Sequence, residues 1–125
     1  MIRRAVLEEI AYQPRQDPAR DWYFDETFRQ SEDIECWMRI ALTTRWAFEG
    51  VAGLLTQYRI STGGLSAATD KQLAAWERMV EKLTPLNPAF FEVKTPVARA
   101  YQLRYLCRRA ISDMDANRAY TLSKE

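Results

Sequence analysis

The sequence contains no histidine, and this absence removes several kinds of active site at once. Histidine is the commonest general base near neutral pH, and it completes most serine and cysteine nucleophile sites and most zinc sites. Acid–base chemistry in this chain therefore has to be carried by carboxylates.

The sequence also has few cysteines, a small net charge and no long apolar run. Cys36 and Cys107 are too few for a disulfide framework, and both are expected as buried free thiols on helices. The net charge of +1 gives no strong field that would recruit nucleic acid or an anionic membrane. Because no apolar run could span a bilayer and no secretory signal is visible, we expect a cytoplasmic protein, with the inner face of the membrane as an alternative.

The chain is long enough for a hydrophobic core and has the composition of a globular protein. It has 125 residues, of which 47% are apolar and 28% charged. Apolar periodicity predicts helices over residues 2–11, 31–43 and 66–83. Thr95 is expected to cap a last long helix with Pro96 at its first position, and a helical hairpin is expected to end the chain.

The strongest helical pattern begins at Ser31. Apolar residues from Ile34 to Leu42 recur at helical spacing, and the Ser31 hydroxyl is expected to cap the helix. Glu32 and Asp33 fall in the first turn, where the helix dipole favours negative charge. Two carboxylates at this place suit a general base or a polar anchor, although acidic residues often only stabilise a helix start.

Several side chains around this helix have two interpretations. Glu35 and Arg39 have the spacing of a surface ion pair. Trp37 lies one turn beyond Asp33 and could cover a pocket or pack in the core. Upstream, Phe24 and Phe28 are expected in a small aromatic core. The rings of Trp22 and Tyr23 could instead face a sugar.

Two later segments alternate polar and apolar residues as half-buried strands do. These segments are residues 45–49 and 54–60, and they predict an antiparallel pair. The expected fold class is therefore α+β, mainly α, with helices flanking one short β-pair. Arg59 lies at the end of the second strand, where a guanidinium could bind phosphate oxygens with two parallel hydrogen bonds.

A group of short motifs resembles the acceptor side of family 2 glycosyltransferases. Phe24-Asp25-Glu26, then Glu32-Asp33, then Trp37-Met38-Arg39-Ile40-Ala41 is similar to the segment in which FDE leads into an ED-x-x-x-W-x-R-[LI]-A helix. Leu54 to Ser66 is similar to the family's L-x-x-Y-R-x-H-x-x-S-x-S segment. Ser61 stands where many members have a histidine that helps to hold the metal.

The resemblance covers about residues 1–67 and implies a domain organisation. Residues 1–66 would be the acceptor-side segment of a GT-A catalytic domain, and residues 67–125 a C-terminal extension with tetratricopeptide-like helices. The chain would then be the C-terminal part of a longer inverting glycosyltransferase, inactive by itself. Exposed apolar surface would favour a homodimer.

The resemblance also implies roles for individual residues. Asp33 would be the catalytic base, and Glu32 would bind the acceptor or influence Asp33, and is the second candidate for the base. Arg59 would bind the leaving diphosphate beside Tyr58. Two further residues, Trp37 and Arg39, would help to bind substrate.

The implied substrates are a nucleotide-sugar donor and a glycan or lipid-linked acceptor, as in the synthesis of cell-envelope polysaccharides. A divalent ion, Mg²⁺ or Mn²⁺, is expected in the full-length parent, with no metal ligands and no cofactor in this chain. No nucleic-acid partner is expected. The alternative is a non-catalytic helical module that binds another protein through its last two helices.

Two charged features near the C-terminus have simple structural explanations. The arginines of the last long helix are expected to form a solvated face, although such a helix could also touch a membrane or nucleic acid. They are Arg99, Arg104, Arg108 and Arg109. Asp113-Met114-Asp115 resembles a metal-binding Asp-x-Asp, but its position between helices favours a turn and an N-cap.

Overall fold

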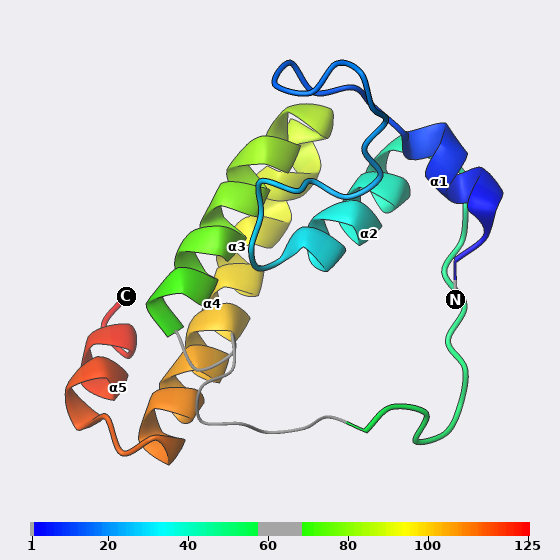
Figure 1. Ribbon diagram of the computed structural model, residues 1–125. Coiled ribbons are helices and arrows are strands. Elements are labelled where there is room, and N and C mark those ends of the chain that lie inside the picture. Colours follow the sequence, from blue (N-terminus) through cyan, green and yellow to red (C-terminus); the bar gives the residue numbers. More distant parts are fainter. Residues whose placement is uncertain (1, 58–68) are drawn as a thin grey trace. The chain divides into compact units, whose positions relative to one another are not determined.

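The computed structural model describes residues 2–57 and 69–125, which contain five α-helices and one short 3-10 helix (Figure 1). The chain divides into two compact units, residues 1–59 and 60–125, and each is described by itself. None of these helices combines the length and apolar character that crossing a bilayer needs. The elements are α1 (Arg4–Ile10), α2 (Glu32–Thr43), α3 (Thr69–Leu83), η2 (Thr84–Leu86), α4 (Pro88–Ser112) and α5 (Ala116–Leu122).

The first unit is built on the packing of α1 against α2. Both helices carry apolar residues at intervals of three and four, and these residues meet in one small core. The buried members are Val6, Ile10, Cys36 and Ile40. Both helices of the first unit were thus predicted by apolar periodicity, with ends that differ by one or two residues.

The loop between α1 and α2 is closed by one antiparallel bridge. The Tyr12 N–H donates to the Trp22 carbonyl at 3.1 Å, and the Trp22 N–H donates to the Tyr12 carbonyl at 2.8 Å. The two rings also meet edge to face, with centroids 6.4 Å apart. Trp22 is buried, so its ring belongs to the core of the unit and the alternative in which it faces a sugar is wrong.

The α+β prediction is wrong for the part of the chain that the structure describes. Residues 45–57 form no strand, and residues 58–60 of the expected second strand lie outside the described ranges. Alternation predicts a strand only where a second backbone supplies hydrogen bonds, and no such partner lies beside 45–57 among the described residues. Trp46 packs against the core of the unit, but most of the large apolar side chains of this segment are exposed: Phe48, Val51, Leu54 and Leu55.

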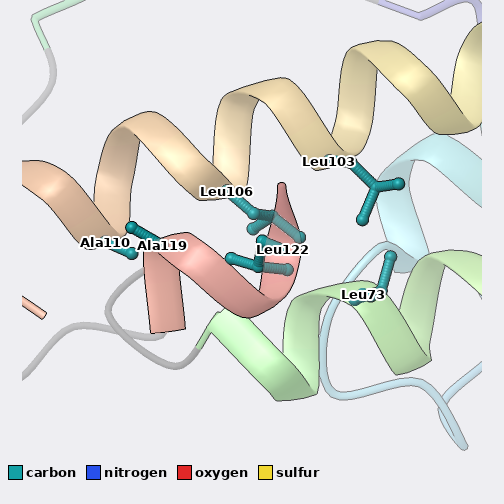
Figure 2. Close-up of a cluster of buried hydrophobic side chains, with 6 residues drawn as sticks. All are labelled: Leu73, Leu103, Leu106, Ala110, Ala119 and Leu122. Carbon is teal, nitrogen blue, oxygen red and sulfur yellow. The ribbon is translucent and has the colours of Figure 1, made fainter. Parts of the chain in front are cut away.

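The second unit buries one hydrophobic cluster between α3, α4 and α5. Figure 2 shows side chains from all three helices pointing toward one another. Leu106 of α4 and Leu122 of α5 are the most deeply buried of them. The other members are Leu73, Leu103, Ala110 and Ala119.

The start of α4 differs from the prediction. The helix begins at Pro88, and the Asn87 side chain caps it by accepting from the Phe90 N–H at 3.1 Å. Pro88 suits this first position because its missing N–H would have no helical partner there. Pro96 therefore lies inside the helix, and Thr95 is not its cap.

The buried face of α4 also differs from the expected one. Apolar spacing in the sequence predicts a buried face made of Ala100, Leu103, Cys107, Ala110, Ile111 and Met114. Leu103 and Ala110 are buried, but Ile111 and Met114 are exposed. Leu106 occupies the centre of the buried face because α3 and α5 both pack on that side. The apolar pattern of α4 is nearly continuous around the helix, so its periodicity alone does not identify the buried side.

This difference gives a direct test. Leu106→Ala should lower the free energy of unfolding by about 2–5 kcal/mol, because the substitution leaves a cavity in the cluster of Figure 2. Ile111→Ala on the same helix is the control and should cost less than about 0.5 kcal/mol. Urea unfolding followed by circular dichroism measures both, and equal losses would contradict the assignment of the buried face.

Candidate functional site

The predicted site lies at the first turn of α2, where Glu32 and Asp33 are both exposed. The Asp33 Oδ1 atom accepts from the Ile34 N–H at 2.8 Å. Among the described residues Asp33 forms no ion pair, so this carboxylate is open to solvent and to a ligand. The prediction that both acids occupy the first turn is confirmed.

Ser31 stands at the N-cap position but does not cap the helix with its hydroxyl. Its backbone is left-handed, with φ at 66°, and its carbonyl accepts from the Glu35 N–H at 2.9 Å. A capping hydroxyl requires an extended backbone at this position, which explains why the predicted side-chain bond is absent at this helix start. A left-handed serine also costs conformational energy, so surrounding contacts must hold it.

Glu35 and Arg39 form a buried ion pair, and the prediction of a surface pair is wrong. The Glu35 side chain is 0% exposed and the Arg39 side chain is 11% exposed. Arg39 Nε lies 3.0 Å from Glu35 Oε1, and its Nη2 lies 3.3 Å from Oε2. Burial is tolerated because the guanidinium and the carboxylate satisfy each other with two hydrogen bonds.

Arg39 also fastens α2 to two other segments. Its Nη1 donates to the Ile10 carbonyl at the end of α1, and its Nη2 donates to the Tyr23 carbonyl, both at 2.6 Å. The guanidinium carbon lies 5.0 Å from the centre of the Tyr12 ring. Arg39 thus positions the helix that carries Asp33, and its implied contact with substrate stays a prediction.

The FDE segment is anchored by its own acids. Asp25 is buried, and its Oδ1 accepts from the Thr27 N–H at 2.9 Å and from the Thr27 hydroxyl at 2.6 Å. Glu26 receives two hydrogen bonds from the Arg20 guanidinium, each 2.8 Å long. These two carboxylates therefore stabilise the turn that precedes α2.

Asp17 completes the network around Arg20. Its Oδ2 accepts from the Trp22 indole N–H at 3.0 Å and from Arg20 Nε at 3.1 Å. The indole bond and then the Arg20 bond lower the pKa of Asp17 below its usual value. The hydrogen bonds that Arg20 donates to Glu26 and then to Asp17 raise the pKa of Arg20.

Exposed aromatic side chains lie next to the acidic pair. Trp37, one turn beyond Asp33 on the same side of α2, is 38% exposed and meets Phe24 edge to face at 6.3 Å. Tyr23 is exposed to a similar degree. Phe28 is buried as predicted, whereas Phe24 is part of the surface and not of the core.

The two residues expected to contact the donor diphosphate, Tyr58 and Arg59, lie outside the described residues, and so does Ser61. The structure therefore brings together Glu32, Asp33 and Trp37, while the position of Arg59 relative to them stays a prediction.

A shallow recess of about 520 Å³ lies near the C-terminal end of α2, away from the acids of the first turn. Its walls include Glu9 and Trp46, and the Trp46 indole N–H donates to Glu9 Oε2 at 2.7 Å. The strand predicted over residues 45–49 does not include this contact. No local pattern indicates it, because Glu9 and Trp46 are far apart in the chain.

No metal centre is visible in the described part of the chain. No three histidine, cysteine, aspartate or glutamate side chains gather there as metal ligands. Asp115 caps α5 by accepting from the Arg118 N–H at 2.9 Å, and Asp113 pairs with Arg109 at 3.1 Å. The prediction of a turn and an N-cap at this Asp-x-Asp is confirmed, and these residues do not fit a metal ion.

Comparison with known proteins identifies no relative. No family model, no curated protein and no solved structure matches the chain.

The buried ion pair should dominate the stability of the first unit. Glu35→Ala leaves Arg39 buried without its counter-charge and should cost about 3–5 kcal/mol in the free energy of unfolding. Glu8→Ala removes the exposed i,i+4 pair with Arg4 and is the matched control, with a much smaller expected effect. Thermal unfolding measures both, and a similar loss of stability in the two variants would show that the buried Glu35 pair stabilises the unit no more than the exposed pair does.

Asp17 predicts a pH dependence of the same unit. The pKa of Asp17 is lower in the folded than in the unfolded chain. Its contribution to the free energy of unfolding is therefore fully present above the unfolded pKa and is lost as the pH falls through the folded pKa. Asp17→Asn should lower the melting temperature at neutral pH and weaken its decline in acid. Asp21→Asn in the same loop is the control, and an unchanged acid decline in Asp17→Asn would exclude this role.

Proposed function

We propose that the first unit is the acceptor-binding part of an inverting glycosyltransferase and that Asp33 is its catalytic base. The observation that carries the proposal is the pair of exposed carboxylates on the first turn of α2, one turn from the exposed Trp37 ring. A flat ring beside a carboxylate is a suitable surface for a pyranose, since the ring covers apolar C–H groups and the carboxylate accepts from hydroxyls.

The reaction is a single displacement. The acceptor oxygen forms a bond to the anomeric carbon of the donor while the bond from that carbon to the diphosphate oxygen breaks. The acceptor proton moves to a carboxylate oxygen of Asp33, and the electron pair of the broken bond leaves with the nucleoside diphosphate. Attack from the side opposite the diphosphate inverts the configuration at the anomeric carbon.

The surrounding residues support this role for Asp33. A base must be held in place but remain accessible, and Asp33 is exposed on a helix that Arg39 fastens to two other segments, at the Ile10 and Tyr23 carbonyls. Glu32 would contact a further acceptor hydroxyl. The roles of Arg59 and Tyr58 at the diphosphate rest on the resemblance of their segment alone. The proposal uses no sheet and no metal ligand of this chain.

Binding of an acceptor sugar can be measured by NMR on the 125-residue chain. Methyl glycosides of the common hexoses should shift the Trp37 indole resonance and the amide resonances of residues 32–34 in a saturable way. Trp37→Ala should abolish these shifts. Trp46, in the same unit but at the other end of α2, is the internal control. Shifts confined to Trp46, or none with any glycoside, would exclude the proposed acceptor site.

The base itself is tested by separating binding from transfer in the complete gene product. Asp33→Asn keeps the shape of the side chain and should leave acceptor binding within a few-fold while lowering the rate of transfer by about 10²–10⁴-fold. Glu32→Gln should mainly raise the KM for the acceptor. An unchanged rate of transfer in Asp33→Asn would show that another group is the catalytic base.

The protein-interaction module stays the second candidate. It would be supported if sugars leave the resonances of α2 unchanged. The exposed side of α4 would then be the surface to examine, because it carries large apolar side chains such as Val93 and Tyr101.

A further inference from the structure

One face of α4 is covered by no other helix among the described residues of the second unit. The helices α3 and α5 pack on the side of α4 that carries Leu103, Leu106 and Ala110. On the other side, residues at intervals of three or four form a continuous row along the helix. This outer row of α4 consists of Phe90, Val93, Val97, Tyr101, Arg104 and Arg108.

The first part of the outer row is apolar and open to solvent. Val97 is 58% exposed and Tyr101 is 65% exposed. Together with Pro96, Ala100 and Arg104 they border a shallow recess of about 460 Å³. A row of large apolar side chains at this exposure adds little to the stability of the unit, so its presence indicates contact with another surface.

The second part of the outer row is cationic, and the structure separates its arginines from the other two of the helix. Arg99 bonds to Glu77 and Glu125, and Arg109 bonds to Asp113. In contrast, Arg104 and Arg108 are exposed and form no ion pair with any residue that the structure describes.

No acidic residue belongs to the outer row. The one carboxylate within α4, Glu92, does not fall at its intervals. Lys94 is exposed close to the row and adds a third cation. Arg104 and Arg108 are solvated, as the sequence predicts, and the charge on this face has one sign.

We infer that the outer row of α4 binds the surface of a bilayer that contains anionic phospholipid. Arginines and a lysine complement lipid phosphates, while valine and aromatic rings enter the boundary between headgroups and acyl chains. Two antiparallel copies of α4 would place these cations against each other's apolar residues without any acid to pair with them. A nucleic acid would satisfy the cations but not the exposed valines. This inference is independent of the proposed catalytic function.

Flotation of the full 125-residue chain with lipid vesicles tests the inference. The protein should float with phosphatidylcholine vesicles that contain phosphatidylserine, should stay behind with pure phosphatidylcholine, and should dissociate as salt is added. Arg104→Ala combined with Arg108→Ala should weaken partitioning about fivefold for each cation removed. Arg15→Ala combined with Lys71→Ala is the control, because it removes the same charge away from the outer row and should change vesicle partitioning little.

A second pair of substitutions tests the apolar part of the row. Val97→Ser with Tyr101→Ser should also weaken partitioning, and the far-UV circular dichroism should not change because both side chains are exposed. Three outcomes would overturn the inference. The first is an equal loss of vesicle partitioning in the two charge variants. The second is a dimer in light scattering that Val97→Ser dissociates, in a protein that does not bind vesicles. The third is binding to duplex DNA or RNA without binding to vesicles.

Discussion

The buried pair of Glu35 and Arg39 is the interaction on which the first unit depends. A charge taken out of water is costly unless each of its polar groups is satisfied, and here the guanidinium donates to a carboxylate and to two backbone carbonyls. Those carbonyls belong to Ile10 and Tyr23, which are far from Arg39 in the chain. One side chain thus joins α2, the end of α1 and the loop before α2, three segments that a small apolar core alone would hold less firmly.

The acids around this pair divide into two groups with different consequences. Asp25 and Glu26 are bonded to Thr27 and Arg20, so they shape the turn that leads into α2. Glu32 and Asp33 remain at the surface of the first turn. The same short stretch therefore contains the contacts that hold the helix start and the carboxylates that this start exposes to solvent, an arrangement that would suit a site built on a rigid element.

The second unit depends on apolar packing, and its two sides have different chemistry. Leu106 and its neighbours on α3 and α5 fill one side of α4 (Figure 2). The other side keeps exposed valine and tyrosine residues, followed by Arg104 and Arg108, which form no ion pair with a described residue. Since burial on one side is enough to hold a helical hairpin together, the composition of the opposite side is free to serve an interface.

Local sequence determined where the helices of this protein lie, because apolar residues at intervals of three and four define a helix wherever a core can form. It also predicted an N-cap at Asp113 or Asp115, and Asp115 caps α5. Tertiary structure decided what local pattern could not. The alternating residues 45–57 have no strand partner among the described residues, and the packing of α3 and α5 put Leu106 rather than Ile111 on the buried side of α4. Burial of Glu35 was likewise decided by Ile10 and Tyr23, because only distant backbone carbonyls could satisfy the arginine that accompanies it.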